Sequence, residues 1–180
     1  MVANHFDTIS YLRSGSAIQQ KAYRALSGCR LLEQLCDYTP ILAGTIPIDI
    51  AVAGSDLDIL CCYTDAQTFI ADIEDLFSQM PDFRIHDQSD DDPAAIVTGF
   101  RLGDFETEIF AHTIPVRQQY GYRHMQIEHA LLNLYGESLR QQVITLKEQG
   151  IKTEPAFCIA LGLSGNPYQT LLQFETGFTT

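Results

Sequence analysis

Basic residues are scarce in this sequence of 180 residues. The chain holds 11 Lys and Arg against 23 Asp and Glu, which gives a formal net charge of −12 and an isoelectric point near 4.6. Proteins that bind polynucleotides rely on Lys and Arg to neutralise the phosphates. So acidic a chain disfavours DNA or RNA as a partner. A single nucleotide stays compatible, because a divalent metal ion can neutralise its charge.

Several targeting and crosslinking signals are also missing. The five cysteines form no Cys-x-x-Cys pair, which favours reduced thiols over a disulfide framework or a zinc site. The N-terminal segment MVANHFDTIS lacks the basic and then apolar pattern of a signal peptide. No apolar run approaches the ~20 residues of a membrane helix. We therefore expect a cytoplasmic protein that does not bind a membrane.

What is present suits an ordinary folded core. Hydrophobic residues make up 46% of the chain and charged residues 19%, which allows a substantial core and argues against disorder. The length predicts one domain over residues 1–180. We expect its core at about 16–114 and a C-terminal helical part at about 115–180.

In the first half of the chain, the sequence predicts a helix, two strands and a second helix, in that order. Apolar residues recur at helical spacing over residues 16–37. ILAG is a short buried strand, and residues 57–63 form the next strand. Thr64 or Asp65 caps a helix that continues to Met80, before a proline.

The second half predicts three strands and then helices. DFRIHDQ is a strand, SDDDPA is an exposed turn, and AIVTGFRL and FETEIFAH are strands joined at Gly103-Asp104, a strong hairpin signal. From Pro115 the pattern is helical, with breaks near Gly136, 150–155 and 165–167. The order predicts an α+β fold, in which a mixed sheet has helices on one face and a C-terminal helical lobe beside a cleft.

Two carboxylates interrupt the second predicted strand. Asp56 and Asp58 are separated by one residue, so a regular strand places both on the same face. Two ionised carboxylates this close repel each other unless a cation lies between them. Oxygen ligands are what Mg²⁺ prefers. The pair indicates part of a site for Mg²⁺ or Mn²⁺, and the structural alternative is the polar edge of a surface strand.

A third carboxylate is available in FETEIFAH. Glu106 and Glu108 have the same parity and share a face in a regular strand. Glu108 lies deeper in the apolar run, so we favour it as the third ligand, with Glu106 as the alternative. Upstream, Gly44-Thr45 suits a phosphate, because glycine permits close approach and a hydroxyl with exposed N–H groups can bind phosphate oxygens.

These residues, in this order, resemble the signature of the nucleotidyltransferase superfamily that includes DNA polymerase beta. The match is Ala-Gly-Thr at residues 43–45, ten further residues, and Asp-Leu-Asp-Ile at residues 56–59. The chain also resembles a bacterial family of unknown function within that superfamily, through GTIPIDI, SDLDI, EIF, YRHMQIEHALL and GIKTEPAF.

The resemblance implies a metal-dependent transfer of a nucleoside monophosphate from a nucleoside triphosphate to an acceptor hydroxyl or phosphate. It implies that Asp56, Asp58 and Glu108 hold Mg²⁺ or Mn²⁺ and form the catalytic set. Gly44 and Thr45 would then touch the triphosphate.

Three further residues are candidates for binding the nucleotide. Ser55 adjoins the acidic motif, Arg123 has the fork that binds phosphate bidentately, and Lys152 could add positive charge to the cleft. The structural alternative for Arg123 and His124 is a surface helix, since Glu128 follows His124 by four residues, as in exposed pairs.

The spacer IPIDIAVAGS departs from the superfamily pattern. It contains Asp49 and no Lys or Arg, although a base near a triphosphate would be favourable. Two alternatives to a nucleotidyltransferase therefore stay open: an inactive module of the same fold that binds or regulates, and a metal-dependent phosphohydrolase. The acidic surface leaves a small molecule or a protein as the acceptor, and self-association stays open.

Overall fold

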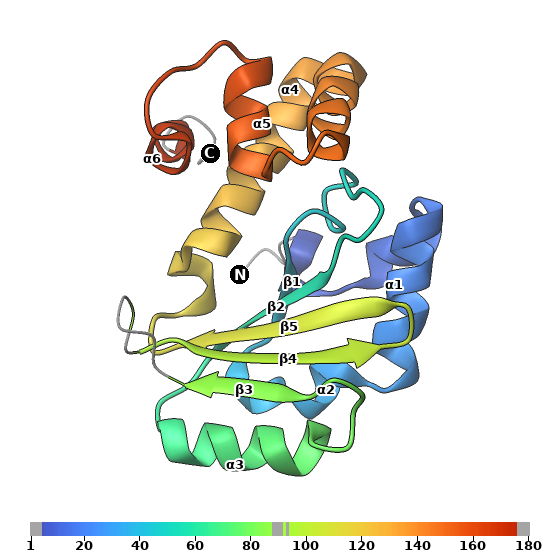
Figure 1. Ribbon diagram of the computed structural model, residues 1–180, viewed down its shortest axis with the longest axis vertical. Coiled ribbons are helices and arrows are strands. Elements are labelled where there is room, and N and C mark those ends of the chain that lie inside the picture. Colours follow the sequence, from blue (N-terminus) through green and yellow to red (C-terminus); the bar gives the residue numbers. More distant parts are fainter. Residues whose placement is uncertain (1–4, 88–91, 93, 176–180) are drawn as a thin grey trace.

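The computed structural model describes residues 5–87, 92 and 94–175, and its centre is a five-stranded sheet in the order β1-β2-β5-β4-β3 (Figure 1). β2 and β5 run parallel, and the other neighbouring pairs are antiparallel. The strands are β1 (Ile41–Ala43), β2 (Leu57–Cys62), β3 (Arg84–Asp87), β4 (Ile96–Leu102) and β5 (Phe105–His112). This mixed sheet confirms the predicted α+β fold.

Residues of the two parallel strands alternate between the faces of the sheet. Leu57, Ile59 and Ile109 are fully buried in a hydrophobic cluster with residues of α1 (Ala17–Gly28) and α3 (Ala66–Phe77). Because side chains alternate along a strand, Asp58 and Glu108 point to the opposite face. The helices thus cover one face and leave the acids on the other.

The N-terminal helical region is interrupted, so the prediction of one helix over residues 16–37 is wrong. After α1, Arg30 adopts a left-handed backbone with φ of 54°, and α2 (Leu31–Gln34) begins there. The change of direction places Leu35 fully buried in the same core. Apolar periodicity did not reveal the break, because both segments keep helical spacing. Short 3-10 segments occupy His5–Asp7, Ser10–Ser14, Cys36–Tyr38 and Val116–Gln118.

A long helix leads from the sheet to a C-terminal lobe. α4 (Tyr120–Glu148) is interrupted at Gly136, whose φ of 70° is uncommon for other residues. Its second half lies with α5 (Thr153–Ala160) and α6 (Pro167–Leu172) beyond the edge of the sheet (Figure 1). A second hydrophobic cluster ties this lobe to β1, to Leu60 and to the loop after β1. The predicted C-terminal helical lobe and its breaks are confirmed.

The remaining predictions are confirmed except for one helix end, since α3 ends at Phe77 and does not continue to Met80. Asp65 caps α3 by accepting a hydrogen bond of 2.8 Å from the Thr68 backbone N–H, and the hairpin between β4 and β5 turns at Gly103. The acidic turn SDDDPA lies outside the described residues, apart from Asp92 and Ala94. All five cysteines are free thiols. Over the part of the chain that the structure describes, no helix has both the length and the apolar character needed to cross a bilayer.

Candidate active site

One row of residues crosses the sheet at the level of the predicted metal ligands. Asp58 is the register partner of Ala43 on one side and of Glu108 on the other. Glu108 in turn pairs with Gly99, and Gly99 with Arg84. Neighbouring strands lie about 4.8 Å apart, and paired residues share a face. The fold therefore brings the carboxylates of Asp58 and Glu108 side by side.

The carboxylates of this row disfavour one another's charge. Burial is the main cause that raises the pKa of Asp58, to about 7, and repulsion from Asp56 and Glu108 adds to it. Burial and the charge of Asp56 also raise the pKa of Glu108, while Arg84 acts in the opposite direction. A bound cation would relieve this repulsion, and a set of oxygen donors suits Mg²⁺.

The residues present therefore fit a divalent cation chemically. In the positions that the side chains occupy, however, no group of three His, Cys, Asp or Glu among the described residues already forms a metal centre. Asp58 and Glu108 are adjacent through strand pairing, whereas Asp56 lies exposed just before β2 and acts on them through its charge. Binding would need a rotation of side chains and no change of strand register.

Glycines leave room for the charged groups of the row. Gly44 has a φ of 77°, and a Cβ atom there would lie 2.1 Å from Oδ2 of Asp58. A Cβ atom at Gly99 would lie 2.5 Å from Cζ of Arg84. Both contacts are far shorter than van der Waals distance, so a side chain at either position would displace a charged group. The close approach of Asp58 therefore explains why position 44 is a glycine.

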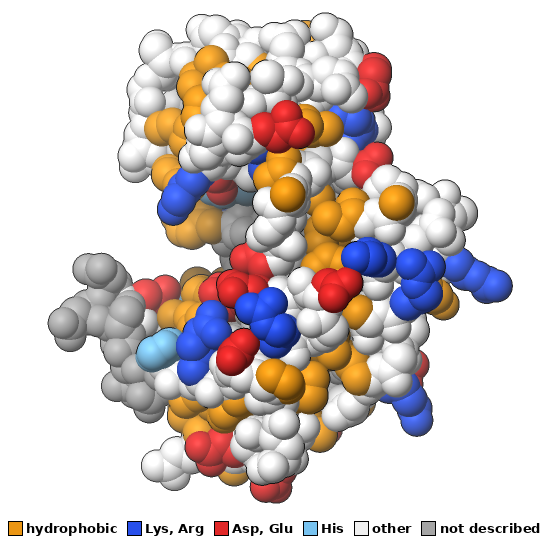
Figure 2. Space-filling view, turned by 45° about the vertical axis from the view of Figure 1, so that its right-hand side comes forward, with side chains coloured by type: hydrophobic (Ala, Val, Ile, Leu, Met, Phe, Trp, Pro, Cys, Tyr) orange, Lys and Arg blue, Asp and Glu red, His pale blue; other side chains and the backbone are white. Residues whose placement is uncertain are grey.

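A cavity of about 910 Å³ lies between this face of the sheet and the first half of α4. That volume is in the range of small-molecule sites. Of the predicted residues, Gly44, Thr45, Asp58, Glu108 and Arg123 line the cavity. Figure 2 shows the molecule hollowed between the sheet and the C-terminal lobe, with acidic side chains beside the hollow.

Three predicted site residues do not line this cavity. Asp56 is exposed beside it, as described above. Ser55 supports the loop, because its Oγ accepts hydrogen bonds from Thr45 Oγ1 at 3.4 Å and from the Val52 backbone N–H at 2.9 Å. Lys152 is the exposed N-cap residue of α5, and the structure does not bring it to the cavity.

The start of α4 differs from the surface helix considered as an alternative. Arg123 lines the cavity and donates two hydrogen bonds to the carboxylate of Glu175, at 2.8 and 2.6 Å. His124 and Glu128 are only 6% and 4% exposed, so the exposed-pair interpretation is wrong. α5 and α6 cover this part of α4, and the spacing of four residues cannot show which face becomes covered.

Lys147 is a basic residue near the site that the sequence did not reveal. Its Nζ donates a hydrogen bond of 2.9 Å to the carbonyl oxygen of Ile50. Burial lowers the pKa of Lys147 to about 8, although Glu128, Asp56, Glu154 and Asp58 act to raise it. Lys147 therefore supplies positive charge close to the acids, from a distant part of the chain.

The spacer with the extra acid is held by another basic residue of α4. Nη1 of Arg140 donates to the carbonyl oxygens of Ile48 and Asp49, at 2.7 and 2.8 Å. Asp49 has a left-handed φ of 59° and does not line the cavity. The acid that departs from the superfamily pattern thus does not face the space next to Gly44 and Thr45.

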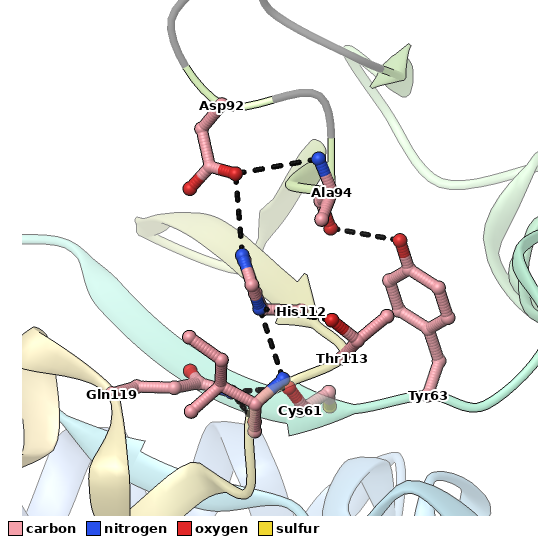
Figure 3. A network of polar contacts seen from close by, with 8 residues as sticks. Cys61, Tyr63, Asp92, Ala94, His112, Thr113 and Gln119 are labelled. Atoms are coloured by element: carbon pink, nitrogen blue, oxygen red, sulfur yellow. Dashed lines mark hydrogen bonds and ion pairs between the residues drawn. The ribbon is translucent and has the colours of Figure 1, made fainter.

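A polar network fixes the ends of β2 and β5 beside the cavity (Figure 3). Nδ1 of His112 accepts a hydrogen bond of 2.9 Å from the Ile114 backbone N–H, so its Nε2 is the atom that donates to Asp92 at 3.2 Å. Nε2 of Gln119 donates to the carbonyl oxygens of Cys61 and Ile114, at 2.8 and 2.9 Å. Because Gln119 is the N-cap residue of α4, the network connects the start of this helix to the end of β2.

The fold and the row of acids define a protein with the nucleotidyltransferase fold. It is similar to the crystal structure of the Cid1 poly(U) polymerase with Mg and 3′-dATP bound, with a TM-score of 0.59 and 14% identity over 88% of this chain and 54% of that one. It is also similar to a cytoplasmic RNA terminal U-transferase, with a TM-score of 0.58 and 16% identity over 81% and 48% of the two chains. The chain is also similar to the structure of the GLD-2/RNP-8 complex, with a TM-score of 0.57 and 11% identity over 89% of this chain and 67% of that one.

The chain spans about half the length of the first two of these proteins. The chain belongs to the family DUF4269, described as a domain of unknown function, which matches residues 24–174. No curated protein matches the sequence.

Proposed function

We propose that the protein is a metal-dependent nucleotidyltransferase, which moves a nucleoside monophosphate from a nucleoside triphosphate to a small-molecule or protein acceptor. The observation that carries the proposal is the register pair of Asp58 and Glu108 on the wall of the cavity, with Gly44 packed against Asp58. The Cid1 structure described with Mg and 3′-dATP bound has a similar fold, which supports a nucleotide and a divalent ion as ligands.

Each residue has a role that follows from its place. Asp58 and Glu108, with Asp56 beside them, would hold Mg²⁺ or Mn²⁺. The bound ion would neutralise phosphate charge and align the in-line displacement. The backbone at Gly44 and the hydroxyl of Thr45 would bind phosphate oxygens.

Lys147 would add positive charge near the same acids, because it interacts electrostatically with Asp56 and Asp58. In the reaction, the acceptor oxygen bonds to the α-phosphorus while pyrophosphate leaves. Glu108, whose raised pKa follows mainly from its burial, would accept the proton of the acceptor.

The acidity of the chain supports a small molecule or a protein as acceptor. The neighbours are described as RNA uridylyl transferases or poly(U) polymerases, but the net charge of −12 in this chain opposes the approach of a polyanion. We therefore do not extend their RNA acceptor to this protein.

A second candidate is an inactive module that keeps the fold and binds or regulates. It is favoured by the spacer after Gly44-Thr45, which contains Asp49 and no Lys or Arg. A third, the phosphohydrolase, would use the same carboxylates without an acceptor. Turnover distinguishes them, because the module gives none and the hydrolase releases phosphate without labelling an acceptor.

The test combines binding with turnover. In a thermal-shift assay, a nucleoside triphosphate together with Mg²⁺ or Mn²⁺ should raise the melting temperature of the wild type. The same ligands should not raise the melting temperature of Asp58→Asn. The α-phosphate label of the bound triphosphate should then appear in an acceptor from a pool of small molecules or in protein. If no triphosphate stabilises the chain with either metal, and Asp58→Asn behaves as the wild type, the proposed function is wrong.

A further inference from the structure

The cavity has a second acidic wall, which lies opposite the sheet and is made by helices. Glu128 of α4 and Glu154 of α5 line it, together with His124. None of these residues belongs to the carboxylate row of the sheet. The proposed metal site therefore does not account for the acids of this wall.

Glu128 is a buried acid without a partner. It is 4% exposed and lines the cavity, and among the described residues it makes neither a hydrogen bond nor an ion pair. Lys147 is near enough to favour its charge, but the Lys147 Nζ donates to the Ile50 carbonyl. A buried carboxyl group without hydrogen bonds is costly. Such a residue indicates that a ligand supplies the missing donors.

Glu154 is the second acid of this wall, and within the part of the chain that the structure describes it accepts no hydrogen bond either. Its Oε1 lies 3.6 Å from Nδ1 of His124. Nε2 of His124 lies 2.9 Å from the carbonyl oxygen of Tyr168 and therefore carries the proton of the neutral ring. Nδ1 of that tautomer has no proton to donate to Glu154. Burial and the charge of Glu154 together raise the pKa of Glu128 to about 8, so the charge of Glu154 disfavours ionisation of Glu128.

The arginines of the cavity do not neutralise this wall, because each has acidic or polar partners of its own. Arg117 donates to Asp7 and, at 2.8 Å, to the hydroxyl of Tyr122. Arg123 is engaged by Glu175. The helical wall is therefore complementary to a compact donor of positive charge that can make several hydrogen bonds. A protonated primary amine has these properties.

We propose that Glu128 and Glu154 form the acceptor subsite and recognise a protonated amine on a small-molecule acceptor. The proposal rests on the proposed nucleotidyltransferase function, and it names the class of acceptor. The amine would bind between the two carboxylates on the helical wall, and the acceptor would extend across the cavity toward Asp58 and Glu108 on the sheet. A polyanionic acceptor would meet like charge on both walls.

The test measures binding of amines to the full chain by calorimetry and thermal shift. The probes are spermidine and aminohexanol, with hexanediol as the neutral match and a short lysine peptide as the protein-derived source of an amine. Both free amines should bind the wild type and hexanediol should not. Glu128→Gln and Glu154→Gln should each weaken amine binding by about tenfold or more, as expected for loss of a charged hydrogen bond.

The control is Glu148→Gln, which changes an exposed acid of α4 and should bind amines like the wild type. Removal of the charge at Glu128 should not unfold the protein, because that charge is unfavourable where it is buried, and Glu154→Gln provides an independent variant. Equal binding of hexanediol, binding of the lysine peptide alone, or unchanged amine binding in both variants would overturn the proposal. So would stabilisation by Mn²⁺ alone that is lost in Glu128→Gln, which would indicate a metal site.

The outcome is separable from that of the proposed function. Triphosphate and metal binding depend on Asp58, whereas amine binding depends on Glu128 and Glu154. If triphosphate binds and amines do not, only the acceptor subsite is wrong. If amines bind and no triphosphate does, the transferase function fails while the binding subsite for amines remains.

Discussion

Asp58 on β2 and Glu108 on β5 are register partners on parallel strands, and both face the cavity. Strand pairing thus holds two carboxylates next to each other, and the pKa of each is raised, chiefly by burial. Such an arrangement disfavours the fold when both groups are ionised, which is typical of a site that sacrifices stability for binding.

Asp58→Asn should stabilise the metal-free protein at alkaline pH. The pKa of Asp58 is about 7 in the fold and about 4 in an unfolded chain. The folded state therefore binds the proton more tightly, and the free energy of unfolding falls as pH rises between these values. We expect the variant to melt about 2–6 °C above the wild type near pH ~8, and the gap to close toward pH ~4. Calorimetric melting across this range checks it, and a gap that does not vary with pH would contradict the assignment.

Mn²⁺ alone should stabilise the wild type, and more at pH ~8 than at pH ~6, because protons compete with the ion for Asp58. Glu108→Gln should remove this stabilisation. Glu106→Gln is the matched control on the same strand and face, since Glu106 is exposed and bound to Arg101 at 3.3 Å. Thermal melting with and without Mn²⁺ is the measurement. If Glu106→Gln abolished the stabilisation by Mn²⁺ and Glu108→Gln did not, Glu106 and not Glu108 would be the ligand.

Gly44→Ala should weaken metal binding as well as the fold. The added methyl group would lie 2.1 Å from Asp58 Oδ2, at a φ of 77°. Gly54→Ala is the control, because its φ of 85° is also positive but no atom lies within 4 Å of an added Cβ. Gly54→Ala should lose roughly 1 kcal/mol of stability from backbone strain. Gly44→Ala should lose more, because its methyl group also meets Asp58, and only Gly44→Ala should lower the affinity for Mn²⁺. Equal affinities in titration calorimetry would show that this contact does not position Asp58.

Lys147→Met should raise the pKa of Asp58 and of Glu128, because Lys147 favours the ionised form of both. The midpoint of Mn²⁺ binding against pH should therefore move upward. Lys152→Met, at an exposed position outside the cavity, should leave the midpoint unchanged. Calorimetric titration with Mn²⁺ across pH checks both variants, and identical midpoints would remove Lys147 from the electrostatics of the site.

The sequence predicted the parts of the site that local patterns encode. Alternation along a strand places Asp58 and Glu108 on the polar face, and the apolar run around Glu108 distinguishes it from Glu106 near the turn. The helix cap at Asp65 and the hairpin at Gly103 are likewise local. These features depend on neighbours within a few residues, so they can be read without tertiary structure.

Contacts between distant segments could not be predicted in the same way. Lys147 reaches the acids only because α4 breaks at Gly136 and its second half folds back toward the loop after β1. Glu128 has the spacing of an exposed pair, but α5 and α6 cover it. Arg30 ends a helical pattern whose apolar spacing continues beyond it. In each case packing of remote segments decides the outcome.

In the proposed function, Asp58 and Glu108 hold a divalent ion against a triphosphate at Gly44-Thr45. A crystal structure with Mn²⁺ and a nonhydrolysable nucleoside triphosphate tests it most directly. We expect an anomalous peak at about 2.0–2.3 Å from oxygens of both carboxylates, with the phosphates against Gly44 and Thr45. A triphosphate bound elsewhere, or an anomalous peak that neither carboxylate contacts, would show that these residues do not form the site.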